Sequence, residues 1–163
     1  MSNAPVTLTV STITEDENYD DTVAVLAINR PDAANAFNAD VMDQLIDKLN
    51  MIASNDTIRV LIIKGEGRHF SAGADLGWMK DSAKLSMDQN IADAKNLTNL
   101  FETLTNLRIP TIAVVSGAAY GGAVGLVAAC DYAIATDTAK FCLSEVKLGL
   151  LPAVILPYLG RKI

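Results

Sequence analysis

The chain has 163 residues, enough for one ordinary domain, and we expect a single domain over residues 1–163. Hydrophobic residues make up 50% and charged residues 20% of the sequence, which excludes disorder as a description of the whole chain. The formal net charge of −6 disfavours a surface that follows nucleic-acid phosphates, so we expect no nucleic-acid partner. One histidine and two cysteines exclude a multi-histidine metal centre and a cysteine-rich zinc site, and we expect no metal.

The first third of the chain predicts two strands and a helix. Partial alternation of apolar and polar residues predicts a strand over 6–13, and a nearly continuous apolar run predicts another over 22–28. Apolar residues then recur at helical spacing from Ala39 to about Ser54. Asn38, directly before them, has a side chain that can cap a helix.

The middle of the chain predicts a strand, a loop and a second helix. The run 59–64 is short and apolar at its centre, as is typical of a buried strand. Residues 65–77 are rich in glycine and alanine and predict a loop. Ser86 and Gln89 form a capping-box signature at the start of a helix that Pro110 ends.

The last third contains an uncharged stretch, 109–130, that is long enough to span a bilayer. Its proline, glycines and many alanines favour two buried pieces instead, a strand over 111–115 and a small-residue helix from about Tyr120. We therefore expect no membrane association. The remaining predicted elements are two short strands and a last helix that Pro157 interrupts: 131–135, 140–143 and 151–159.

Hydrophobic strands alternate with helices along the whole chain. This pattern predicts an α/β layer structure with largely parallel strands that are covered on both faces. No basic-then-apolar signal segment opens the chain, so a reducing cytoplasm or an organelle matrix is the simplest compartment, and we expect the cytoplasm.

Two glycine-rich turns follow predicted strands. Residues 70–76 (FSAGADL) come after the strand 59–64, and residues 116–122 (SGAAYGG) come after the strand 111–115. Parallel sheets bind ligands outside the carboxyl ends of their strands, and small residues there let backbone N–H groups approach a ligand closely. One N–H from each turn could hold a developing oxyanion, with the dipole of the following helix adding to the field. The alternative is that these glycines serve only tight turns and close helix–sheet packing.

Glu145 is the candidate acid–base group. It follows the strand 140–143 and has apolar neighbours on both sides. Partial burial would raise the pKa of its carboxyl and suit it to general acid–base catalysis. The alternative is a solvated carboxylate beside Lys147.

Other polar residues near these segments have simpler interpretations. Asp75 is best explained as a helix cap or turn residue, and His69 as a loop or surface residue. Cys130 and Cys142 lie in apolar runs, where we expect them to be buried and unreactive. Tyr120 stands beside the Gly-Gly turn, where its phenol could reach a ligand.

Four short motifs follow one another along the chain: NRP (29–31) with NA (35–36), the glycine-rich motifs FSAGADL (70–76) and GAAYGGA (117–123), and the glutamate-bearing segment 141–152. Through these motifs the chain, from about Thr22 to its end, resembles the crotonase superfamily, the enoyl-CoA hydratase/isomerase family, in which the two glycine-rich motifs are the oxyanion loops. Each motif is short, but their order and spacing together make the resemblance strong.

The resemblance implies a fold of ββα repeats wound into a spiral, and coenzyme A thioester substrates. It implies that the thioester oxygen lies between the N–H groups of Ala74 and Gly122, with Glu145 as the acid–base residue. It implies coenzyme A contacts from Ala34, Ala72, Asp75 and Leu76. We expect no separate cofactor, because coenzyme A is part of the acyl-CoA substrate.

Two departures from the family pattern matter. Typical hydratases carry a further glutamate in the helix after the second glycine turn, where this chain has Gly125. Only Glu145 then remains, and the missing bulk would admit a branched or longer acyl chain. Family members also continue with helices that cover the active site and build trimer contacts. We therefore expect a core that lacks this C-terminal helical region, and a homo-oligomer, trimer or hexamer, as in the family.

Three functions fit this resemblance. The leading one is hydration of a 2-enoyl-CoA. The segment 141–159 resembles bacterial hydratases of branched dicarboxylic enoyl-CoAs, such as methylglutaconyl-CoA or carboxygeranoyl-CoA. A single glutamate also suits an enoyl-CoA double-bond isomerase. The third function is a catalytically silent, coenzyme A-binding remnant.

Overall fold

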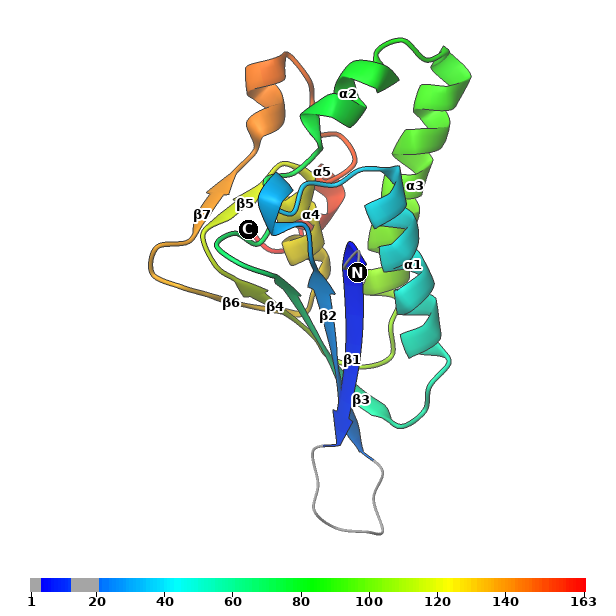
Figure 1. Ribbon diagram of the computed structural model, residues 1–163, viewed down its shortest axis with the longest axis vertical. Helices are drawn as coiled ribbons and strands as arrows, with labels where there is room; N and C mark the ends of the chain where they lie inside the picture. The colour runs from blue at the N-terminus through cyan, green and yellow to red at the C-terminus, as the bar shows by residue number, and fades with distance from the viewer. Residues whose placement is uncertain (1–3, 13–20) are drawn as a thin grey trace.

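The computed structural model describes residues 4–12 and 21–163. Its central sheet consists of β1 (Val6–Thr12), β2 (Thr22–Ile28), β3 (Ile58–Gly65), β4 (Thr111–Val115) and β6 (Tyr132–Ala135), in that spatial order (Figure 1). β1 pairs antiparallel with β2, and all the other neighbouring strands pair parallel. The predicted largely parallel sheet is therefore confirmed. Ile13, the predicted end of the first strand, lies outside the described residues.

Two long helices, α1 (Ala39–Ala53) and α3 (Met87–Thr105), lie side by side, and α1 packs on β1 and β2 (Figure 1). Asn38 Oδ1 accepts a backbone N–H of the first turn of α1 at 3.0 Å. Ser86 and Gln89 form a capping box at the start of α3. Both predicted helix starts are confirmed, because these side chains satisfy N–H groups that have no partner within the helix.

The core lies between the sheet and these helices. Fully buried side chains from both layers meet there: Leu26, Ile28, Leu61, Ile63, Leu45, Leu49, Phe101 and Leu104. The opposite face of the sheet is open at β4 and β6 in the described part of the chain, where Val114, Tyr132 and Ile134 are 38%, 66% and 60% exposed. The prediction that the strands are covered on both faces is wrong for these two strands.

The uncharged stretch 109–130 folds as β4, a short strand β5 (Ala118–Tyr120) and the helix α4 (Gly122–Ala129). The helix begins later than the sequence predicted. Gly121, with φ 53° and ψ −125°, separates the strand from the helix because this conformation belongs to neither element. None of the described helices is both long and apolar enough to cross a membrane.

The remaining elements are short: the 3₁₀ turns Pro31–Ala33 and Ser144–Leu148, the strand β7 (Lys140–Cys142), and the helices α2 (Leu76–Ser82) and α5 (Leu156–Leu159). β7 pairs parallel with β5 in a separate two-stranded sheet. α2 begins inside the predicted loop 65–77, and the helix predicted over 151–159 is reduced to α5. Pro157 lies in the first turn of α5 and starts this helix rather than interrupting it, because a first-turn proline lacks only an N–H that would have no partner.

A glycine makes the close contact between α4, α3 and α5. A Cβ added at Gly125 would lie 2.4 Å from Cγ2 of Ile155 and 2.8 Å from Cζ of Phe101. The volume that a side chain at position 125 would occupy is therefore already filled. The expected extra room for a branched or longer acyl chain is wrong at this position.

This contact predicts that Gly125→Ala destabilises the fold. Overpacking costs about 1–3 kcal/mol, while alanine recovers about 1 kcal/mol of helix propensity, so we expect a net loss in the free energy of urea unfolding. Gly122→Ala, in the same helix, is the matched control, since its Cβ would meet Phe37 only at 3.6 Å. Equal stabilities of the two variants would contradict this account of the packing.

Candidate active site

The two glycine-rich turns meet at the carboxyl end of the parallel strands, as expected from the sequence. The N–H of Ser71 donates to the carbonyl of Ala118 at 3.0 Å, and the N–H of Tyr120 donates to the carbonyl of Ser71 at 3.0 Å. On its other side the first turn pairs with Phe37, whose N–H donates to Gly73 at 2.7 Å. The segment 70–75 is thus held between β5 and the chain before α1.

The backbone N–H groups of Ala74 and Gly122 take no part in these hydrogen bonds. Phe37 bonds the carbonyl of Gly73 and the N–H of Asp75, so the peptide groups of Ala74 point away from Phe37. Gly122 is the first residue of α4, where an N–H has no acceptor within the helix and the helix dipole is positive. In the described part of the chain, neither N–H donates a hydrogen bond. The expected pair of oxyanion donors is therefore present as two unengaged groups.

Close packing of the turns depends on glycine at two positions. Gly73 has φ 88°, and a Cβ there would lie 2.6 Å from the carbonyl oxygen of Tyr120. Gly121 has φ 53°, and its N–H donates to the carbonyl of Cys142 at 2.8 Å. A side chain at Gly73 would push the two turns apart, whereas one at Gly121 would press on Glu145, whose Oε1 lies 3.2 Å from that Cβ position.

Glu145 lies over the second turn. It belongs to the 3₁₀ turn Ser144–Leu148 and is half-buried. Its Oε1 lies 3.2 Å from the position of a Cβ at Gly121, and its Oε2 is buried without a hydrogen-bond partner among the described residues. In the same part of the chain, no ion pair joins Glu145 to Lys147. The geometry favours a partly buried carboxylate over the solvated one.

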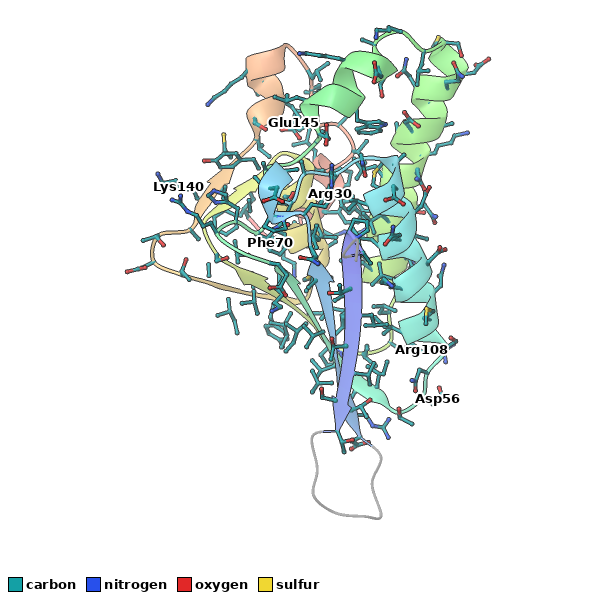
Figure 2. All side chains as sticks on the ribbon, in the orientation of Figure 1. Arg30, Asp56, Phe70, Arg108, Lys140 and Glu145 are labelled. Atoms are coloured by element: carbon teal, nitrogen blue, oxygen red, sulfur yellow. The ribbon has the colours of Figure 1, made fainter. Side chains whose placement is uncertain are left out.

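The labelled side chains in Figure 2 show where this site lies on the sheet. Glu145 and Arg30 lie toward one end of the molecule, and Asp56 and Arg108 lie toward the other (Figure 2). Arg30 follows β2, whereas Asp56 and Arg108 precede β3 and β4. The candidate site is therefore at the carboxyl ends of the strands, where parallel sheets bind ligands.

Two cavities meet at these groups. The first, of about 680 Å³, has mostly apolar walls and extends under α2 toward α3 and α5; its lining includes Phe37, Met42, Trp78, Leu97, Leu151 and Ile155. The second, of about 480 Å³, extends toward the chain around Ala33; its lining includes Ala36, Ala72, Asp75, Tyr120, Ser144 and Lys147. Both cavities share Ala74, Leu76, Met79, Gly122 and Glu145. A ligand that occupies both would pass the unengaged N–H groups and the carboxylate at the junction.

The expected coenzyme A residues are only partly gathered here. Ala72, Asp75 and Leu76 line the second cavity. Ala34 does not line it; its carbonyl instead accepts the N–H of Ala72 at 2.9 Å. Lys147, which the sequence suggested only as a neighbour of Glu145, also lines this cavity. Its position in the 3₁₀ turn, which the sequence did not predict, explains why it was missed.

The buried side-chain amide of Asn35 joins the N-R-P segment to the loop directly before the first glycine-rich turn. Asn35 is fully buried with φ 56°, and its Oδ1 accepts the N–H of Arg30 at 2.8 Å. Its Nδ2 donates to the carbonyls of Glu66 at 2.8 Å and His69 at 2.7 Å. These bonds give a physical reason for an asparagine after NRP at this spacing.

Asp75 is the cap of α2, as its simpler interpretation predicted. Its Oδ1 accepts the N–H groups of Gly77 at 2.9 Å and Trp78 at 3.3 Å, and its Oδ2 accepts from Arg30 at 3.1 Å. The hydrogen bond from Trp78, reinforced by Arg30 and Gly77, lowers the pKa of this carboxyl against the opposing effect of partial desolvation. Its carboxylate oxygens are therefore engaged with the protein.

Two further residues complete the comparison with the sequence. Cys130 is buried as predicted, and burial raises the pKa of its thiol to about 12, which keeps it unreactive near neutral pH. His69 lies in a loop, as predicted, but it is half-buried and its Nδ1 accepts the N–H of Ala118 at 3.1 Å. No local sequence pattern predicts this contact, because its partner, Ala118, lies in β5, far from His69 along the chain.

The engagement of Asp75 predicts a pH-dependent stability difference. A carboxyl whose pKa in the folded state lies below its ordinary 3.8 stabilises the fold above that value and loses the contribution as the pH falls through the lowered pKa. We expect Asp75→Asn to lower the free energy of unfolding at pH 7 by at most about 1 kcal/mol, since the pair is partly solvated. The difference from the parent chain should shrink as urea unfolding is repeated below about pH 4. A difference that stayed constant with pH would contradict this role.

Known proteins are similar to this chain in sequence. The family model for enoyl-CoA hydratase/isomerase matches residues 18–163. A Mycobacterium bovis protein named "Probable enoyl-CoA hydratase echA8" is 39% identical over 138 residues, which cover 83% of this chain and 51% of that protein. A crotonyl-CoA hydratase of Syntrophomonas wolfei subsp. wolfei is 37% identical over 131 residues, covering 80% of this chain and 49% of that protein.

A solved structure agrees over almost the whole chain. The crystal structure of a Legionella pneumophila protein assigned to the enoyl CoA hydratase/isomerase (crotonase) group superposes with a TM-score of 0.91 at 41% identity. The match covers 99% of this chain and 59% of that one. The chain thus spans about half the length of the curated relatives it matches. Its sequence and its α/β fold both place it in the enoyl-CoA hydratase/isomerase family, with the crotonase fold.

Proposed function

We propose that this protein hydrates a 2-enoyl-CoA thioester. One observation carries the proposal: two unengaged N–H groups, of Ala74 and Gly122, and the unpartnered Oε2 of Glu145 meet where two cavities join. The acyl group would occupy the mostly apolar first cavity. The pantetheine arm of coenzyme A would lie in the second, along Ala72, Asp75 and Leu76 with Ala34 behind them.

The oxyanion donors supply the main stabilisation in this mechanism. The thioester oxygen would accept hydrogen bonds from Ala74 and Gly122, and these bonds strengthen as the oxygen gains charge in the enolate. Donors fixed by the fold need no reorganisation when that charge develops. No separate cofactor enters the proposed reaction.

Glu145 performs both proton transfers in turn. Its carboxylate takes a proton from water as the water oxygen bonds to C3 and the electrons of the double bond move into the thioester enolate. The protonated carboxyl then returns a proton to C2 as the enolate collapses. One carboxyl group suffices because the two transfers are sequential.

An enoyl-CoA isomerase is the second candidate, and the single carboxylate favours it specifically. Isomerisation moves one proton between two carbons of the acyl chain through the same enolate. Gly125 stands where typical hydratases carry a further glutamate, and Ile155 fills the space beside it. A catalytically silent protein that binds coenzyme A thioesters is the third candidate.

For the acyl group, we propose a branched or dicarboxylic 2-enoyl chain. The resemblance of residues 141–159 to hydratases of such substrates supports this choice. Lys80 lines the first cavity, where an ammonium group would suit a second carboxylate. The proposed assembly is a homo-oligomer, a trimer or hexamer as in the family, and the proposed compartment is the cytoplasm.

We expect Glu145→Gln to lower kcat by at least about 10²-fold, because the amide can neither take nor return the proton. Binding of a non-reactive acyl-CoA should change little. The readout is the ultraviolet loss of the conjugated enoyl thioester, with Kd measured alongside. Asp93→Asn is the matched control, since Asp93 is another carboxylate that lines the first cavity. Full activity of Glu145→Gln would remove Glu145 from the mechanism.

Product mass separates the candidate reactions. Crotonyl-CoA, 3-methylglutaconyl-CoA and a 3-enoyl-CoA are each incubated with the chain. We expect the 2-enoyl substrates to gain one water. If only the 3-enoyl substrate reacts, keeping its mass but gaining the ultraviolet absorption of a conjugated enoyl thioester, the protein is an isomerase instead. Binding without any product would favour the silent protein.

A further inference from the structure

His69 joins the two turns that carry the candidate oxyanion donors. Its half-buried ring lies at the start of the first turn, and Nδ1 accepts the N–H of Ala118, the first residue of β5, at 3.1 Å. Its carbonyl accepts Nδ2 of Asn35 at 2.7 Å. The side chain and the main chain of this residue therefore bind different segments.

The imidazole of His69 accepts a hydrogen bond that a backbone carbonyl would accept in a regular parallel pairing. Ser71 pairs with Ala119 in the parallel pattern: its N–H donates to the carbonyl of Ala118, and its carbonyl accepts the N–H of Tyr120. Continued backward by two residues, this pattern would direct the N–H of Ala118 to the carbonyl of His69. Asn35 already occupies that carbonyl, and the imidazole nitrogen serves as the acceptor instead.

The fit around the ring is tight. A Cβ at Gly117 would lie 2.6 Å from Nδ1 of His69 and 2.2 Å from the carbonyl oxygen of Arg68. The neighbouring N–H of Phe70 donates to the carbonyl of Ser116 at 2.8 Å. The imidazole is thus placed by packing against a residue without a side chain, and by backbone bonds on its own segment.

The contact also fixes the protonation of the ring. Nδ1 can accept the N–H of Ala118 only as a lone pair, so the ring must be neutral with its proton on Nε2. A protonated ring would set an N–H against the N–H of Ala118 and break the contact. Charge and tautomer of the only histidine in the chain are therefore coupled to the geometry of the second turn.

We propose that His69 is a positioning residue for the reaction of this site. As the neutral Nε2–H tautomer it holds β5 in register with the first turn. It thereby sets the spacing between the N–H groups of Ala74 and Gly122. This inference rests on the proposed function for its effect on turnover, while the contact itself is tested without turnover.

Charged residues occur on the segments packed around the ring. Glu66 and Arg68 are on its own loop, Arg30 precedes Asn35, and the N–H of Lys140 donates to the carbonyl of Gly117 at 2.8 Å. Among the described residues, none of these charged side chains hydrogen-bonds to the imidazole. The N–H of Ala118 is the partner that protonation of the ring would lose.

Nitrogen NMR tests the contact directly. In the untagged chain labelled with ¹⁵N-histidine, every ring signal comes from His69. We expect the neutral ring to show a proton on Nε2 and an unprotonated Nδ1. A neutral ring with its proton on Nδ1, or an equal mixture of tautomers, would overturn the proposal.

His69→Asn and His69→Leu test the consequence as a matched pair. Asparagine Oδ1 can take the place of Nδ1 and does not titrate, whereas leucine offers no acceptor. Complete loss of an oxyanion donor lowers kcat by about 10²–10³-fold. We therefore expect the displaced donor in His69→Leu to lower kcat by about tenfold with little change in KM. His69→Asn should keep most of the activity.

Thermal unfolding separates a failure of this inference from a failure of the proposed function. If the parent chain turns over no enoyl-CoA, the proposed function fails, but the tautomer and the melting temperature still decide the role of His69. We expect His69→Leu to melt below His69→Asn near neutral pH. Equal melting temperatures of both variants would overturn the proposal.

Discussion

The candidate site depends on the hydrogen bonds of one buried amide, that of Asn35. It accepts from the N–H of Arg30 and donates to the carbonyls of Glu66 and His69, so a single side chain joins the segment after β2 to the segment after β3. Only an amide offers an acceptor and two donors in so little space. Its left-handed backbone is unfavourable in itself, and these bonds offset that cost. The carbonyl of His69 accepts from Asn35 while the imidazole Nδ1 of the same residue accepts the N–H of Ala118, so His69 links this segment to the second turn as well.

Three polar groups without hydrogen-bond partners among the described residues lie where the two cavities join. They are the N–H groups of Ala74 and Gly122 and the buried Oε2 of Glu145. A buried polar atom without a partner costs about 1–3 kcal/mol, and Glu145 Oε2 is such an atom. Binding of a carbonyl oxygen and a water would supply the missing bonds. These groups would then have no hydrogen-bond partner in the free protein and would be hydrogen-bonded in the complex. That arrangement stabilises a developing oxyanion.

The sequence predicted the elements whose signals are local. The caps at Asn38 and Ser86, the buried strands and the two glycine turns after strands were all placed correctly, because each depends on a few neighbouring residues. The errors fall where a distant segment decides the outcome. β5 exists because β7 and Ser71 pair with it, and position 125 is filled by Ile155, which lies far along the chain. The open face at β4 and β6 escaped the prediction because an apolar run does not show which of its faces will be covered.

Gly125 and Ile155 also restrict the chemistry of the site. With that position filled by packing, α4 carries no carboxylate, and in the proposed reactions the acid–base work is assigned to Glu145. Hydration and isomerisation then use the same groups in the same order: a proton is taken by the carboxylate, an enolate forms, and a proton is returned. They differ in where the first proton comes from, a water whose oxygen bonds to C3 or a carbon of the acyl chain, and in which carbon receives the returned proton. The choice between them is therefore set by whether the mostly apolar cavity leaves room for a water near Glu145 once the acyl group is bound. It follows that the shape of the acyl group, as much as any catalytic residue, decides which reaction such a site performs.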